Sequence, residues 1–184
     1  MQVNDFFKGE EAMKEIMLLA AADANWGIGY QNRLLFHLKE DMKYFRKLTL
    51  GNIVVMGRKT FESLPEGRPL PGRTNIVLTR QTGWGTVLAK GEEEFVVLHS
   101  PEQVLSYVAE RKEDVYVIGG GEVYRQFLRC ASKAYITKVQ AERQADTFFP
   151  DLDQMAGWGR VYESERIHDE TGVEYQFVQY NRAK

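Results

Sequence analysis

Residues 115–129, Val-Tyr-Val-Ile-Gly-Gly-Gly-Glu-Val-Tyr-Arg-Gln-Phe-Leu-Arg, predict a strand, a glycine turn and a helix in direct succession. The short apolar run at 115–118 is typical of a buried strand. The three glycines at 119–121 let a bulky, charged group approach the backbone closely. Their spacing matches neither the Gly-x-Gly-x-x-Gly dinucleotide fingerprint nor a P-loop with its lysine. The stretch therefore predicts an α/β unit and leaves its ligand open.

A second unit of this kind occupies residues 53–64. Residues 53–56, Ile-Val-Val-Met, predict a central strand that ends at Gly57, and residues 61–64 predict a helical turn. A strand followed by a helix start points backbone N–H groups at an anion.

Three cations stand where two predicted strands end. Arg58 and Lys59 follow the strand at 53–56, and Arg80 follows a strand at 75–79. If these strands are parallel neighbours, the three charges converge at one edge of the sheet. They would then bind a phosphate; solvated surface charges are the alternative.

The rest of the chain continues the alternation of strands and helices. Further strands are predicted at residues 16–22, 95–98 and 134–139. Ser100 and Pro101 begin a helix that runs to about Arg111. Residues 160–165 and 174–180 alternate like the strands of a hairpin. This order predicts an α/β fold with a mostly parallel sheet and an antiparallel edge.

Residues 34–49 predict an amphipathic helix with one carboxylate on its apolar face. At about 100° per residue, Asp41 shares this face with Leu38, Met42, Phe45, Leu48 and Thr49. A buried charge is costly unless paired, so an inward carboxylate is hydrogen-bonded, paired or functional. Alternatively, Asp41 caps or complements the helix N-terminus. The helix alone leaves both readings open.

Residues 23–32, Asp-Ala-Asn-Trp-Gly-Ile-Gly-Tyr-Gln-Asn, predict a loop between the first strand and this helix. Open α/β sheets place ligands at the carboxyl ends of their strands. A loop of this length without structure of its own is more often functional than a plain connector. We therefore expect it to contact a ligand.

The bulk composition excludes several function classes. The chain has 184 residues and a net charge of −2, which gives no general case for binding nucleic acid or acidic lipid. One cysteine, Cys130, and three dispersed histidines make a metal site unexpected. The apolar run at 16–22 is too short to span a membrane, and the acidic segment before it does not resemble a secretory signal. These features predict a cytoplasmic protein.

The length fits one domain. We assign residues 15–184 to it and treat residues 1–14 as an N-terminal extension of unknown role.

Six pieces of the sequence together match a known family. They are Ile28-Gly29, Asp41 with Phe45, Val55-Met-Gly-Arg-Lys-Thr60, Arg68-Pro-Leu-Pro-Gly-Arg73 with Asn75, Ile118-Gly-Gly-Gly-Glu-Val-Tyr124, and Asp146-Thr147 with Phe149-Pro150. In this order and spacing, the chain resembles the dihydrofolate reductase family from about residue 15 to 180. The resemblance implies a central, mostly parallel eight-stranded sheet with an antiparallel C-terminal edge hairpin and helices on both faces. It also implies NADPH-dependent reduction of 7,8-dihydrofolate to 5,6,7,8-tetrahydrofolate and inhibition by antifolates. We further expect a monomer, and we expect no fused companion domain in a chain of this length.

The resemblance also assigns roles to residues. The expected catalytic residues are Asp41, which binds the pteridine, Phe36, which walls it, and Thr137, which partners Asp41. The expected substrate-binding residues are Leu19, Ala21, Asp41, Phe45, Leu64, Leu70, Arg73 and Thr137, with Arg73 on the carboxylate of the glutamate tail. The expected cofactor-binding residues are Ala21, Ile28, Gly29, Gly57, Arg58, Lys59, Thr60, Leu78, Thr79, Arg80, Ile118, Gly119, Gly120, Gly121, Glu122, Val123 and Tyr124. Within this set, the charges of Arg58, Lys59 and Arg80 predict a preference for NADPH over NADH.

The chain departs from the family pattern before the acid. Leu35 and Phe36 replace a usual proline and tryptophan, and Lys39 replaces a frequent proline. Two other functions are weighed beside the reductase. One is the related pyrimidine reductase of riboflavin synthesis, which would not be expected to combine Asp41 with Arg73. The other is a dinucleotide-binding sensor without chemistry, against which Asp41 argues.

Overall fold

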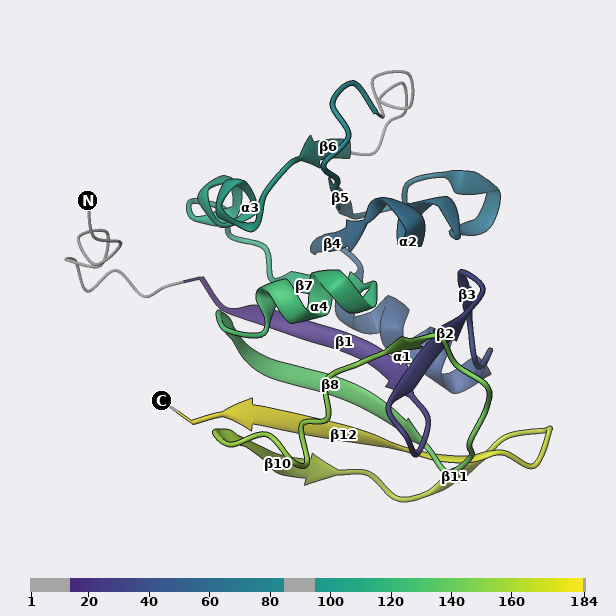
Figure 1. The fold of residues 1–184 in the computed structure, drawn as a ribbon. Coiled ribbons are helices and arrows are strands. Elements are labelled where there is room, and N and C mark those ends of the chain that lie inside the picture. The colour runs from purple at the N-terminus through teal and green to yellow at the C-terminus, as the bar shows by residue number, and fades with distance from the viewer. Residues whose placement is uncertain (1–13, 85–94, 184) are drawn as a thin grey trace.

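The computed structural model describes residues 14–84 and 95–183 (Figure 1). The proposed extension at 1–14 lies outside these ranges except for Lys14, so its assignment as an extension stays a prediction.

The main sheet runs in the order β10-β12-β8-β1-β7-β4-β5-β6, and β11 pairs with β12 beside this path. The strands are β1 (Ile16–Ala22), β4 (Ile53–Gly57), β5 (Thr74–Leu78), β6 (Phe95–Leu98), β7 (Val115–Gly119), β8 (Ala131–Val139), β10 (Trp158–Glu163), β11 (Ile167–His168) and β12 (Glu174–Arg182). Pairing is parallel from β8 through β6, whereas β12 is antiparallel to β8, β10 and β11. The mostly parallel sheet with an antiparallel C-terminal edge is thereby confirmed.

The helices are α1 (Lys39–Thr49), α2 (Arg58–Glu62), α3 (Pro101–Val108) and α4 (Gly121–Phe127), with a 3₁₀ turn at Pro65–Gly67. Ser100 caps α3 as predicted, because its side chain accepts a hydrogen bond from the Gln103 N–H. The predicted end of α3 near Arg111 is wrong. The Arg111 N–H bonds to the Val108 carbonyl, three residues back, so the last turn tightens and the α-helix stops.

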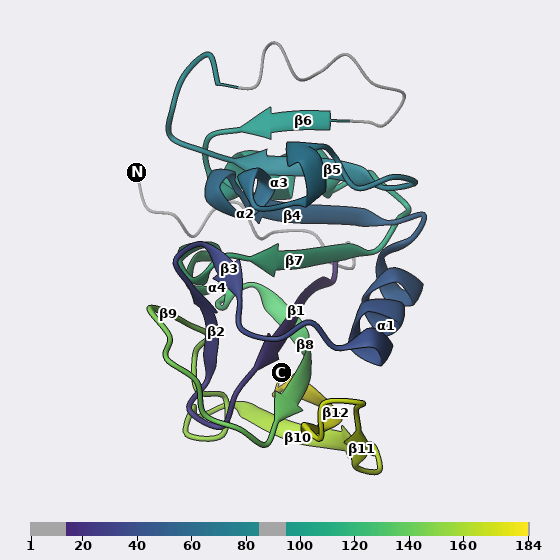
Figure 2. The same cartoon turned by 90° about the vertical axis from the view of Figure 1, so that its right-hand side faces the viewer.

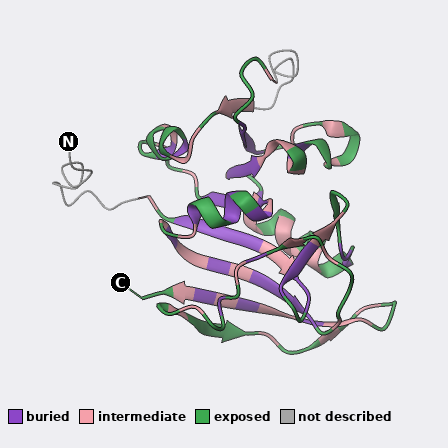
Figure 3. Cartoon of the chain, viewed as in Figure 1, coloured by how far each residue is buried: buried purple, intermediate pink, exposed green. Residues whose placement is uncertain are grey.

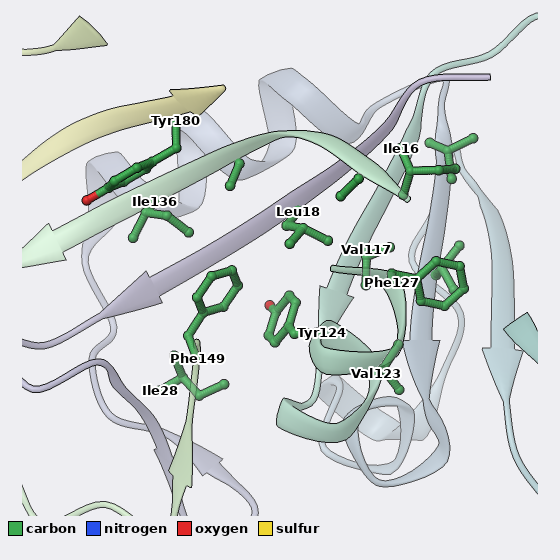
Figure 4. Close-up of a cluster of buried hydrophobic side chains, with 14 of the residues drawn as sticks. Ile16, Leu18, Ile28, Val117, Val123, Tyr124, Phe127, Ile136, Phe149 and Tyr180 are labelled. Carbon is green, nitrogen blue, oxygen red and sulfur yellow. The ribbon is translucent and has the colours of Figure 1, made fainter. Parts of the chain in front are cut away.

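Helices cover both faces of the sheet, and side chains that alternate along a strand pack against different helices. In β1, Ile16 and Leu18 belong to the cluster that contains side chains of α3 and α4, whereas Met17 and Leu19 pack with α1. Figure 1 accordingly shows α4 in front of β1 and α1 behind it. Burial is concentrated in the strands and in the helix faces toward them (Figure 3). Figure 4 shows the α4 side of this core, where Phe127 and Tyr124 point toward Val117 and Leu18.

A second, smaller sheet was not predicted. It contains β3 (Arg33–Leu34), β2 (Gly27–Tyr30) and β9 (Thr147–Phe148) in that order, all antiparallel. The interpretation of residues 23–32 as a loop without structure of its own is therefore wrong. Figure 2 shows this sheet standing beside α4, at the end of the β7 arrow.

Truncation of Phe127 tests the packing of α4. The side chain is completely buried in the main core, so Phe127→Ala removes buried apolar surface and leaves a cavity. We expect a loss of about 3–5 kcal/mol in the free energy of unfolding, measured by urea denaturation. Val161→Ala on the exposed β10 edge is the control and should change stability by less than about 0.5 kcal/mol. Equal effects of the two variants would contradict the described packing.

Candidate active site

A cavity of about 1330 Å³ lies where the parallel strands β1, β4, β5 and β7 end. Its walls also include parts of α1, α2, the start of α4 and the β2–β3 hairpin. This is the position at which open α/β sheets bind ligands.

Most of the predicted site residues line this cavity. They are Leu19, Ala21, Ile28, Gly29, Phe36, Asp41, Phe45, Gly57, Arg58, Lys59, Thr60, Leu64, Leu70, Leu78, Thr79, Arg80, Ile118, Gly119, Gly120, Gly121, Glu122, Val123 and Tyr124. Arg73 and Thr137 are outside the wall and buried behind it.

A residue of the main sheet holds Asp41 in place. It lies in the first turn of α1, but the helix N-cap, Leu38, makes no side-chain capping bond. Instead the Thr137 hydroxyl donates to Asp41 Oδ1 at 2.6 Å. The parallel register of β1 and β8 sets Thr137 directly beside Ala21, at the cavity edge. The functional reading of Asp41 is therefore favoured over simple capping.

The electrostatics of Asp41 match a partly dehydrated acid. Burial raises the pKa of the Asp41 carboxyl above its usual range, and the hydrogen bond from Thr137 acts in the opposite direction. A raised pKa in a cavity wall marks a candidate for acid–base chemistry.

Arg73 is fixed behind Phe45. Its Nε donates to Thr49 Oγ1 at 2.8 Å, its Nη1 donates to the Pro71 carbonyl at 2.6 Å, and its guanidinium lies 5.8 Å from the centre of the Phe45 ring. Burial and the nearby charge of Arg46 lower the pKa of Arg73. Within the described residues, Arg73 forms no ion pair with an acidic side chain. A fixed guanidinium without an acidic partner suits an anionic group of a ligand.

Three glycines bring the starts of α2 and α4 close together. A Cβ on Gly57 would lie 3.1 Å from Val123 Cγ2, and one on Gly120 would lie 3.3 Å from Thr60 Oγ1. A Cβ on Gly121 would meet the β9 backbone, 3.2 Å from the Phe148 carbonyl oxygen. Side chains at these positions would collide with α2, α4 or β9, so the glycines allow these segments to pack closely against one another.

The three predicted cations share this end of the cavity, because β4 and β5 are parallel neighbours. Arg58 is partly neutralised, since its Nη1 donates to Glu62 Oε1 at 2.7 Å. Together with the glycines, Lys59 and Arg80 make this end suitable for a phosphorylated dinucleotide.

Several wall residues were missed. His99, whose Nδ1 lies 2.7 Å from the Thr79 carbonyl oxygen, follows β6 just as Arg58 and Arg80 follow β4 and β5. The position of His99 directly after a strand could therefore have predicted it as a cavity residue. Met42 was assigned to the inward face of the helix but is 48% exposed, at the cavity wall.

In residues 14–84 and 95–183, no group of three or more acidic, cysteine or histidine side chains is placed to hold a metal ion. No helix in this part of the chain is long and apolar enough to cross a membrane.

Comparisons with known proteins agree with this geometry. The sequence model of the dihydrofolate reductase family matches residues 15–182. The dihydrofolate reductase of Neisseria gonorrhoeae is 39% identical over 168 residues, which are 91% of this chain and 98% of that protein. The Haemophilus influenzae enzyme is 42% identical over 83% of this chain and 89% of its own length.

A solved structure gives the same result. The dihydrofolate reductase of Enterococcus faecalis, complexed with NADP(H) and RAB-propyl, superposes with a TM-score of 0.80 at 33% identity. The alignment covers 94% of this chain and 98% of that chain. With these matches over nearly the full domain, the chain belongs to the dihydrofolate reductase family.

Proposed function

We propose that Asp41, Phe36 and Thr137 form the catalytic group with which this chain carries out the reaction of its family. That reaction is the NADPH-dependent reduction of 7,8-dihydrofolate to 5,6,7,8-tetrahydrofolate. The observation that carries the assignment is a carboxylate in the cavity wall, partly removed from water and held by one hydroxyl of the sheet.

Asp41 binds and orients the pteridine. Its carboxylate accepts hydrogen bonds from the amino group and a ring N–H, a fork of donors that matches its two oxygens. The negative charge favours protonation of N5 through water. Thr137 fixes the carboxylate on the Oδ1 side, and Phe36 walls the ring and excludes bulk water. Bound NADPH supplies the hydride that C6 accepts.

The remaining substrate contacts are apolar, with one cation. We assign the pteridine and benzoyl rings to five residues that line the cavity: Leu19, Ala21, Phe45, Leu64 and Leu70. Arg73 is assigned to the glutamate carboxylate. Its fixed guanidinium and the nearby Arg46 support this role.

The cofactor half uses the two glycine turns. Gly57 to Thr60 and Gly119 to Tyr124 are assigned to the pyrophosphate, and Ala21, Ile28 and Gly29 to the nicotinamide. Arg58, Lys59 and Arg80, with Leu78 and Thr79, are assigned to the adenosine end and its 2′-phosphate. The position of Gly57, Gly120 and Gly121 in the cavity wall, at the starts of α2 and α4, supports this assignment.

Three broader proposals accompany these roles. The chain acts as a monomer in the cytoplasm, forms one domain at 15–184, and binds antifolates in the same cavity as dihydrofolate. The complex of the Enterococcus faecalis relative with NADP(H) and RAB-propyl supports a cavity that holds cofactor and a second ligand together.

The catalytic role of Asp41 is tested by Asp41→Asn. Loss of the carboxylate removes the charge that favours N5 protonation, so turnover at neutral pH should fall by about 10²-fold or more. The measurement is dihydrofolate-dependent NADPH oxidation, followed by absorbance. The affinity for NADPH should be unchanged, because Asp41 is not assigned to the cofactor. Wild-type turnover in the variant would refute the assignment.

The same variant tests the environment of Asp41 through stability. Because the folded-state pKa is raised, the folded protein binds more protons than the unfolded chain between the unfolded and the folded pKa. Ionised Asp41 therefore lowers stability as pH rises through that window. Asp41→Asn should unfold at a higher temperature than wild type at neutral pH and at a similar temperature below the unfolded pKa, about 3.9. A lower melting temperature at neutral pH would contradict the dehydrated carboxylate.

Arg80→Ala tests the phosphate assignment. Loss of a charged contact to the 2′-phosphate should weaken NADPH binding about tenfold or more, and NADH binding should stay the same. Fluorescence titration measures both. Arg68→Ala is the matched control, since Arg68 is exposed and paired with Glu66. Equal weakening for both dinucleotides would place Arg80 away from the 2′-phosphate.

A further inference from the structure

Arg143 joins two segments of the cavity wall from outside the cavity. It lies in the connection after β8, and its backbone N–H donates to Asp23 Oδ2 at 3.0 Å. The fully buried Asp23 also accepts hydrogen bonds from the N–H groups of Asn25, just before β2, and of Gly27, the first residue of β2. The side chain of Arg143 reaches elsewhere. Its Nη1 donates to the Leu35 carbonyl, and its guanidinium carbon lies 4.3 Å from the centre of the Phe36 ring.

Phe36 depends on its neighbours for its orientation. Residues 35–38 lie between β3 and α1 and form no regular secondary structure, so no ladder or helix fixes this backbone. The ring has no polar atom of its own. Phe36 shares a buried apolar cluster with Leu38, Val139 and Tyr175, and within the described residues Arg143 is the one cation over its ring.

The chemistry of the contact suits an arginine. A planar guanidinium can stack on an aromatic ring while one of its N–H groups binds a carbonyl beside that ring. The ammonium of a lysine would make one of these contacts at a time. Within the described residues, the Arg143 side chain forms no ion pair with a carboxylate, so its fixed partners are the Phe36 ring and the Leu35 carbonyl.

We propose that Arg143 is a positioning residue for dihydrofolate, which acts by holding Phe36 and the Leu35 peptide against the pteridine end of the cavity. The proposal rests on the substrate-wall role assigned to Phe36 above. The backbone contact of Arg143 with Asp23 and its side-chain contacts with Leu35 and Phe36 can be tested separately. The backbone N–H that donates to Asp23 is retained in any substitution other than proline, whereas the contact with Phe36 requires the arginine side chain.

Arg143→Ala tests the side-chain branch. Loss of a cation–π contact and one hydrogen bond should raise the KM for dihydrofolate about fivefold to thirtyfold and slow hydride transfer. The dissociation constant for NADPH should stay unchanged, because the residues assigned to the cofactor phosphates and the backbone hydrogen bond to Asp23 are both retained. Arg143→Lys should recover part of the loss. Arg166→Ala is the control and should behave as wild type, because Arg166 is exposed and pairs with Glu174 away from the cavity.

A double-mutant cycle with Phe36→Leu tests whether Arg143 acts through the Phe36 ring. If Arg143 acts through the ring, removing Arg143 in the Phe36→Leu background should add little further change in the KM for dihydrofolate. Additive effects would overturn the proposal. So would a normal Arg143→Ala enzyme, or equal losses for dihydrofolate and NADPH with a lower melting temperature, which indicate a general structural role.

The single variants also distinguish the role of Arg143 from that of Phe36. An impaired Phe36→Leu enzyme beside a normal Arg143→Ala enzyme would overturn the role of Arg143 alone. A normal Phe36→Leu enzyme would overturn the assignment of Phe36 and the positioning role with it.

Discussion

The hydrogen bond between Thr137 and Asp41 is the interaction on which the site depends. It requires two separate features: the parallel register that sets Thr137 beside Ala21 and the packing of α1 against Met17 and Leu19. A shift of one residue in β8 would turn Thr137 to the opposite face of the sheet. The packing of the sheet therefore determines the chemistry of the carboxylate.

The fold was largely predictable because its signals are local. Apolar runs such as residues 53–56 mark buried parallel strands, and Ser100 with Pro101 marks a helix start. The second sheet was not predictable in the same way. β2 contains two glycines in four residues, and it is a strand because β3 and β9 pair with it rather than through intrinsic preference.

The candidate site was predictable where its residues follow strand ends, and less so where contacts are distant in sequence. Lys59 and Arg80 could be placed in the cavity wall from the order of the strands alone. His99 also follows a strand end and lines the cavity, although it was not predicted. The stacking of Arg143 on Phe36 spans more than a hundred residues and joins two irregular segments. Neither periodicity nor turn chemistry specifies which side chains meet there, because only the assembled sheet brings them together.

The separation of Asp41 from Thr137 along the chain has a consequence for biosynthesis. All residues assigned to the cofactor, from Ala21 to Tyr124, precede Thr137 and therefore leave the ribosome before it. The four strands whose ends form the cavity, β1, β4, β5 and β7, are also complete by then. A nascent chain at this stage carries every residue assigned to the cofactor but lacks the hydroxyl that donates to Asp41. Synthesis thus completes the set of residues proposed to bind the cofactor before it adds Thr137, the last residue proposed for catalysis.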